Sequence, residues 1–189
     1  ILTTTWACKK KPSGKLRGRL NIRGYEQVDG KHYYSDSIAA PVTNPNTVRI
    51  VLVLLAMNLK WISMLVDVEG AFLQGKFENG EELYAYVPDG FEKFYDEENE
   101  VLKLNVPIYG TKQAAHCFYK ALVKKVKEKE YERSKADPCL FYCWVDGRLV
   151  VFVSWVDDIM ACGEPDDVKQ LVKDLEDSFE CKCEGELKE

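Results

Sequence analysis

The sequence predicts an α+β fold in which an antiparallel sheet is backed by helices. The first observation is the Asp146-Gly147 pair between the apolar runs 139–145 and 148–155, because Asp-Gly is a strong signal for a two-residue hairpin. The second is the helical spacing of apolar residues in 112–131 and in the segment that Pro165 opens. No internal repeat or low-complexity tract interrupts these elements.

The first third of the chain predicts a hairpin, a helix and a strand. Residues 6–11 and 15–25 read as a basic β-hairpin around a turn at 12–14, where glycine suits the reversal. The segment 47–59 is apolar nearly all round and follows a Pro-Asn pair, so we expect a buried helix. The apolar residues 61–68 predict a short strand.

Two further segments complete the expected elements. Residues 78–100 hold seven Glu and two Asp against one Lys, which predicts an exposed loop with a short strand at 83–87. A second tight reversal is expected at Asp157-Asp158, before the apolar run 159–162.

The charge is distributed unevenly. Residues 1–31 contain eight basic and two acidic groups, so they carry +6, and with a total of −5 the remainder carries −11. A basic lobe suits phosphate binding and an acidic one suits cations. A solvated basic hairpin with no ligand is the alternative.

The seven cysteines predict reduced thiols in an intracellular protein, cytoplasmic or nuclear and not secreted. Cys181 and Cys183 could bind a metal, but strand alternation points both to one face and only two histidines are present. No apolar run reaches the roughly 18 residues of a membrane span. The chain begins at Ile1 and is expected to be an excised fragment.

Three carboxylates form the candidate catalytic constellation. Asp157 and Asp158 lie between strongly apolar strands, and Asp67 ends another apolar strand. If these strands are neighbours, the carboxylates converge and can hold two Mg²⁺ ions, or Mn²⁺, which would activate a hydroxyl and neutralise a leaving pyrophosphate. The alternative is that these residues only form turns.

Six blocks, in order, resemble the copia-type retrotransposon reverse transcriptases, RNA-directed DNA polymerases that act within a polyprotein. Each block is similar to a motif of that family. The blocks are Arg17 to Gln27, Ala40-Pro41-Val42 with Thr47-Val48-Arg49, Asp67 to Leu73, Pro88 to Phe91, Ile108 to Ala114, and Trp155 to Asp158.

The resemblance implies roles in the metal site. Asp67 and Asp157 would hold both metals, Asp158 would support them, and the Val68 carbonyl would add a ligand. The side chain before the Asp pair, Trp155, would lie close to the primer terminus.

The resemblance also implies nucleotide-binding roles. Phe72 would be a steric gate that clashes with a 2′-hydroxyl and so favours deoxynucleotides. Gln113 would line the nucleotide pocket, and Arg19 would clamp the triphosphate with help from a lysine near Lys11.

Three departures from the family pattern bear on primer placement. Trp155 replaces a tyrosine, Thr111 replaces a leucine, and 115–118 reads Ala-His-Cys-Phe where a Pro-Arg-x-Trp-like stretch is usual. All three candidate carboxylates remain. The alternative is therefore a catalytically decayed or recruited palm domain that acts as a structural or nucleic-acid-binding subunit; a generic RNA-binding domain is a further one.

The resemblance implies a domain layout and partners. Residues 1–60 and about 74–115 would be fingers-like, while 61–73 and about 116–189 would be palm-like, with thumb, RNase H and integrase absent. The expected partners are an RNA or DNA template with its primer, deoxynucleoside triphosphates, and the rest of a retroelement polyprotein or an unknown host complex. Whether this chain is an active enzyme is left open by the resemblance.

Overall fold

The structure is a computed structural model that describes residues 1–78, 80–95 and 100–187. The chain divides into two compact units. Unit 1 comprises residues 1–40 and 72–118, and unit 2 comprises residues 41–71 and 119–189. The assignment of fingers-like and palm-like parts stays a prediction.

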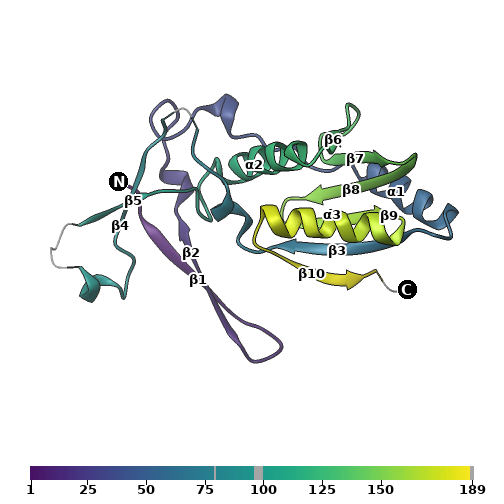
Figure 1. Ribbon diagram of the computed structural model, residues 1–189. Helices are drawn as coiled ribbons and strands as arrows, with labels where there is room; N and C mark the ends of the chain where they lie inside the picture. Colours follow the sequence, from purple (N-terminus) through teal and green to yellow (C-terminus); the bar gives the residue numbers. More distant parts are fainter. Residues whose placement is uncertain (79, 96–99, 188–189) are drawn as a thin grey trace. The chain divides into compact units, whose positions relative to one another are not determined.

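The regular elements are mixed helix and strand, as the sequence predicts (Figure 1). The helices are α1 Pro45–Met57, α2 Ala114–Glu128 and α3 Pro165–Ser178. The strands are β1 Thr4–Lys10, β2 Leu16–Ile22, β3 Ile62–Val68, β4 Leu83–Tyr86, β5 Val101–Leu104, β6 Glu132–Arg133, β7 Leu140–Val145, β8 Arg148–Trp155, β9 Asp158–Gly163 and β10 Cys181–Glu186. Short 3₁₀ turns occur at Gly24–Glu26, Ser35–Ser37, Ala71–Gln74 and Glu92–Phe94.

Unit 1 contains two antiparallel strand pairs. β1 and β2 form the basic hairpin, whose strands pair in register from Thr4 opposite Ile22 to Lys10 opposite Leu16. β4 and β5 form the second pair. Leu2 forms a β-bridge with Ala85 of β4, and both are buried in a small core with Ile22 and Leu83. A core of aliphatic side chains thus connects the base of the hairpin to the β4–β5 pair.

Two glycines in unit 1 allow a close backbone approach. A Cβ added at Gly110, whose φ is +88°, would lie 2.1 Å from the Ile22 carbonyl oxygen, and one added at Gly24 would lie 2.1 Å from the Gly110 carbonyl oxygen. The Ile22 N–H donates a 2.8 Å hydrogen bond to the Tyr109 carbonyl. Side chains are excluded at both glycines, so the segment at Tyr109 lies directly against the end of β2.

Unit 2 is built on a six-stranded sheet in the order β10-β3-β9-β8-β7-β6, in which every neighbouring pair is antiparallel. β3 therefore lies beside β9, although the two strands are some ninety residues apart in sequence. The β7–β8 hairpin turns at Asp146 and Gly147, with φ of 48° and 78°. Both values are positive, as a primed two-residue hairpin turn requires.

Helices cover the sheet of unit 2. α1 contributes the buried Val51 to a core with Val151 and Val153 of β8 and Cys162 of β9. Alternation along β8 places Phe152 on the opposite face, where it stacks on Phe141 at 4.8 Å between ring centroids. α3 runs over β3 and β9 (Figure 1), and its apolar stripe is fully buried. This arrangement confirms the antiparallel sheet backed by helices.

The expectation that α1 is a buried helix is wrong. Val51 is 1% exposed, but Ile50 and Val53 are 60% and 56% exposed and Met57 is 74% exposed. The helix packs on β8 and β9 along one face only. An all-round apolar sequence therefore leaves much of its surface in solvent.

The acidic segment 78–100 falls partly outside the described residues, which omit 79 and 96–99. Within it, β4 spans Leu83–Tyr86, close to the predicted strand. None of the helices in the described ranges has the length and apolarity that crossing a membrane requires.

Candidate active-site residues

The register of the unit 2 sheet brings the three predicted catalytic aspartates to one region. Asp67, near the end of β3, is the direct partner of Asp158 at the start of β9. Directly opposed residues of an antiparallel pair project to the same face, with Cβ atoms about 5 Å apart. The Val68 N–H donates a 2.8 Å hydrogen bond to the Asp157 carbonyl, which holds the next turn against β3.

The turn before Asp158 differs by one residue from the predicted reversal. Trp155 pairs with Asp158, so the two turn residues are Val156 and Asp157. Val156 has φ of +58°, which is rare for a β-branched residue and corresponds to strain of about 1–3 kcal/mol. The Ser154 hydroxyl donates to the Val156 carbonyl at 3.4 Å, and Thr43 donates to the Ser154 carbonyl at 2.5 Å. The neighbouring side chains therefore support a turn whose sequence is unfavourable.

The electrostatics of this region favour a cation. The pKa of Asp158 is raised above its usual value, first by desolvation of the carboxyl and then by the negative charges of Asp157, Asp67 and Glu184. Sequence reasoning missed Glu184, which lies where the β10–β3 register shifts. Such a bulge re-aims a side chain and has no signal in the sequence.

The donor set suits magnesium, because hard divalent cations prefer carboxylate oxygens and would relieve the repulsion that acts on Asp158. Across residues 1–78, 80–95 and 100–187, however, no group of three or more His, Cys, Asp or Glu side chains is already arranged to hold a metal ion. The three aspartates lie at neighbouring positions along the end of β3 and the start of β9.

The other predicted residues of this region are placed as follows. Trp155 is 50% exposed at the end of β8, in cross-strand contact with Asp158. Val68 is buried, and its backbone joins β3 to the turn. Its proposed role as a carbonyl ligand stays a prediction.

In unit 1, two predicted nucleotide-binding residues flank Tyr109. The Arg19 guanidinium lies over the Tyr109 ring, 4.8 Å from its centroid. Phe72 meets the same ring edge-on at 5.2 Å. The Arg19 Nε is buried and has no hydrogen-bond partner among the described residues, so this donor is available to an acceptor that the protein does not supply.

Gln113 is buried and hydrogen-bonded within unit 1. Its side chain is 1% exposed, accepts a 2.9 Å hydrogen bond from Gln27, and donates to the His32 carbonyl and to Glu81. Burial raises the pKa of Glu81 above its usual value. Gln113 thus connects three segments of unit 1. Its role in lining the nucleotide pocket stays a prediction.

Lys11 is exposed beyond the end of β1, where its N–H donates to the Lys15 carbonyl across the hairpin turn. Its side chain is exposed, and its contact with a phosphate stays a prediction.

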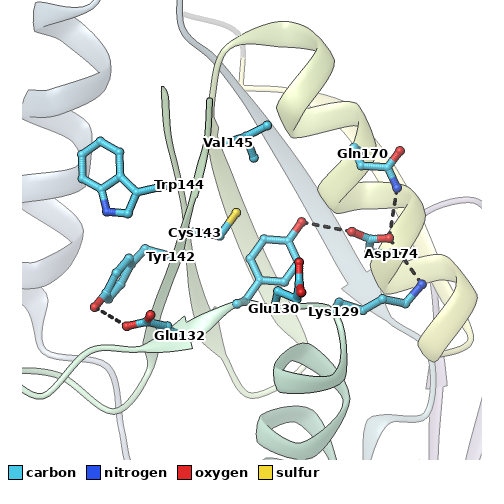
Figure 2. A pocket seen from close by; sticks show the side chains of 10 residues that line it. Lys129, Glu130, Glu132, Tyr142, Cys143, Trp144, Val145, Gln170 and Asp174 are labelled. Carbon is cyan, nitrogen blue, oxygen red and sulfur yellow. Dashed lines mark hydrogen bonds and ion pairs between the residues drawn. The ribbon is translucent and has the colours of Figure 1, made fainter. Parts of the chain in front are cut away.

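A separate pocket of about 320 Å³ lies in unit 2 (Figure 2). Asp174 accepts hydrogen bonds there from Tyr131, Gln170 and Lys129. The pocket is lined by Lys129, Glu130, Tyr131, Glu132, Tyr142, Cys143, Trp144, Val145, Gln170 and Asp174. No predicted site residue is among them, and its polar groups mainly join the end of α2 to α3.

Comparisons with known proteins agree with the motif order. The family described as "Reverse transcriptase (RNA-dependent DNA polymerase)" matches residues 1–189. The Pol polyprotein from transposon TNT 1-94 of Nicotiana tabacum is 31% identical over 97% of this chain and 14% of its own length. Those from transposons RE1 and RE2 of Arabidopsis thaliana are 31% and 32% identical over 92% and 79% of this chain.

The chain spans only 10–14% of the length of these relatives, all of which are described as retrovirus-related Pol polyproteins. The match nevertheless covers every block on which the resemblance rests. The chain therefore belongs to the reverse transcriptase family, in its copia-type branch.

Proposed function

We propose that this chain takes part in RNA-directed DNA polymerisation, as the portion of a copia-type reverse transcriptase that binds the metal ions and the incoming deoxynucleotide. A primer 3′-hydroxyl would attack the α-phosphate, with pyrophosphate as the leaving group. The observation that carries this proposal is the register of Asp67 opposite Asp158, with Asp157 in the adjoining turn.

In the proposed site, Asp67 and Asp157 hold the metals, and Asp158 adds negative charge beside them. Bound Mg²⁺ or Mn²⁺ would lower the pKa of the attacking hydroxyl and stabilise the charge on the phosphate oxygens. The pKa of Asp158 is raised first by desolvation and then by neighbouring negative charges, and the second cause supports this reading because a divalent ion would offset those charges. The backbone bond from Val68 to Asp157 would keep the turn in place as the ions bind.

The proposed nucleotide contacts come from unit 1. Arg19 would bind the triphosphate, because its buried Nε has no hydrogen-bond partner within residues 1–78, 80–95 and 100–187, and a guanidinium matches phosphate geometry. Phe72 would exclude a 2′-hydroxyl. Template choice would come from base pairing, while basic side chains such as Lys11 hold backbone phosphates of the template and primer.

Primer extension tests the proposal. The chain, an RNA template and an annealed DNA primer are incubated with Mg²⁺ and deoxynucleotides, and elongated product is quantified. Asp157→Asn should lower the rate on the order of 100-fold or more, the scale at which loss of one charge-stabilising group acts. Asp146→Asn is the matched control, since it changes an exposed aspartate in the other hairpin turn. Equal extension by Asp157→Asn and the wild type would refute the assignment.

A second candidate is a decayed or recruited domain that binds nucleic acid without catalysis. It is favoured by Trp155, which stands where the family pattern has a tyrosine. Under this reading the folded chain binds template–primer but extends nothing, even in Mn²⁺.

A generic RNA-binding domain predicts in addition that Asp157→Asn leaves both binding and magnesium-dependent stability unchanged.

A further inference from the structure

The sequence singled out Arg19, Phe72 and Gln113 for nucleotide binding, but the structure gathers only the first two, and it gathers them around Tyr109. Tyr109 holds the Arg19 guanidinium on its ring face and the Phe72 ring at its edge. Gln113 is enclosed and hydrogen-bonded elsewhere.

We infer that Tyr109 is a positioning residue that couples triphosphate binding by Arg19 to sugar discrimination by Phe72. This inference rests on the proposed function and names the residue through which the two contacts act together. The ligand it concerns is a deoxynucleoside triphosphate.

The backbone at Tyr109 is fixed, so its ring can serve as a reference for both neighbours. Its carbonyl accepts a hydrogen bond from Ile22 of β2, the strand that also carries Arg19. The collisions that a Cβ would make at Gly24 and Gly110 show that no side chain can separate these segments. Ile108, the preceding residue, packs on the small core of unit 1. The position of Tyr109 is therefore set by its own backbone contacts. Its ring can in turn orient the side chains of Arg19 and Phe72.

The contacts on Tyr109 differ in kind, which gives each a separate consequence. A cation over a ring face is attracted by the ring's quadrupole, so an aliphatic side chain of similar size cannot replace it. This contact orients the guanidinium, and the buried Nε finds no acceptor in the part of the chain that the structure describes. The edge contact with Phe72 limits how far that ring can tilt, and the tilt sets the space beneath a sugar 2′-carbon.

The test measures nucleotide binding without chemistry. A primer ended with a dideoxynucleotide is annealed to a template that presents thymine, and affinities for dATP and ATP are measured in Mg²⁺ with this chain. The two probes differ only in the 2′-hydroxyl. The variants are Tyr109→Phe, Tyr109→Leu and Tyr86→Leu, the last a half-exposed tyrosine on β4 that serves as control.

Tyr109→Phe and the control should bind both nucleotides within about 2-fold of the wild type, because the ring at position 109 is kept or untouched. Tyr109→Leu should weaken dATP binding by about 3- to 30-fold, the range of a cation–π contact. The preference for dATP over ATP should also fall, by about 2- to 10-fold, as the aromatic pair is lost. Circular dichroism would establish that each variant is folded.

Three results would overturn the inference: wild-type affinity in Tyr109→Leu, equal weakening of dATP and ATP with an unchanged ratio, or no preference for dATP in the wild type. The polymerase proposal is judged separately, by extension from an ordinary primer. A chain that prefers dATP through Tyr109 but extends no primer would refute catalysis and leave this inference standing.

Discussion

Divalent cations should stabilise unit 2 through the aspartates where the end of β3 pairs with the start of β9, and Asp158→Asn is the sharpest perturbation of that effect. Directly opposed like charges on a sheet destabilise by about 0.2–1 kcal/mol. Removing the Asp158 charge, which faces Asp67, Asp157 and Glu184, should therefore raise stability by up to about 1 kcal/mol when EDTA is present. When metal is present, the wild type should be more stable than Asp158→Asn.

The size of the metal effect follows from mass action. A cation at a concentration of 100 times its Kd stabilises the folded state by about 2.7 kcal/mol. For a chain of this length, 1 kcal/mol moves Tm by about 2–4 °C, so the wild type should gain about 5–10 °C. Asp158→Asn should keep less than about half of that shift, because one charge opposite the ion is lost.

The assay is thermal unfolding at pH 7, followed by circular dichroism, in EDTA, MgCl₂ or MnCl₂ at constant ionic strength. Asp146→Asn provides the control, and its metal-dependent shift should equal that of the wild type. Because the pKa of Asp158 is raised, the folded state binds this proton more tightly than the unfolded state does. Apo stability should therefore gain as pH falls through that pKa, while protons compete with the metal and reduce its shift. No metal-dependent shift in the wild type, or a full shift in Asp158→Asn, would refute the reasoning.

Three other perturbations test separate features. Asp137 is 3% exposed, and hydrogen bonds from Thr47 and from backbone N–H groups lower its pKa although burial acts in the opposite direction. Asp137→Asn should therefore lower the free energy of unfolding by about 1–3 kcal/mol near neutral pH, measured by urea unfolding. This difference should vanish in acid, as pH falls through the depressed pKa; a pH-independent cost would contradict it. Val156→Gly should change the free energy of unfolding by less than about 1 kcal/mol, because relief of positive-φ strain offsets the added entropy of the unfolded chain. A loss above about 2 kcal/mol in the same assay would argue against strain at this position. In thiol labelling at pH 8, exposed Cys8 should react well before Cys143, whose pKa burial raises to about 11, and equal rates would contradict this.

The sequence was sufficient for those features that local chemistry determines. The Asp146-Gly147 pair predicted the hairpin, and the structure gives both residues the positive φ angles that few other residues tolerate. The apolar strands around Asp67 and Asp157 allow the pairing of β3 with β9, but the sequence does not show that the two strands are neighbours. The structure supplies the register that makes Asp67 the partner of Asp158.

Other features had no local signal. A positive φ is unfavourable for valine, so the sequence predicts the reversal at Asp157-Asp158, whereas the turn residues are Val156 and Asp157. The exposure of α1 depends on which strands it packs against. Because apolar residues lie on nearly all sides of this helix, its sequence does not indicate which face is buried. The burial of Gln113 depends on hydrogen bonds to residues more than 80 positions away, such as Gln27 and His32.

The solvent-facing side of α1 has a practical consequence for these measurements. Ile50, Val53 and Met57 present apolar surface on the folded protein, and Leu59 just beyond the helix is 98% exposed. Dyes that fluoresce on apolar surfaces should therefore bind before any unfolding, giving a high initial signal that heating changes little. Melting curves for this chain are better recorded by a spectroscopic probe of its own backbone than by an added fluorophore.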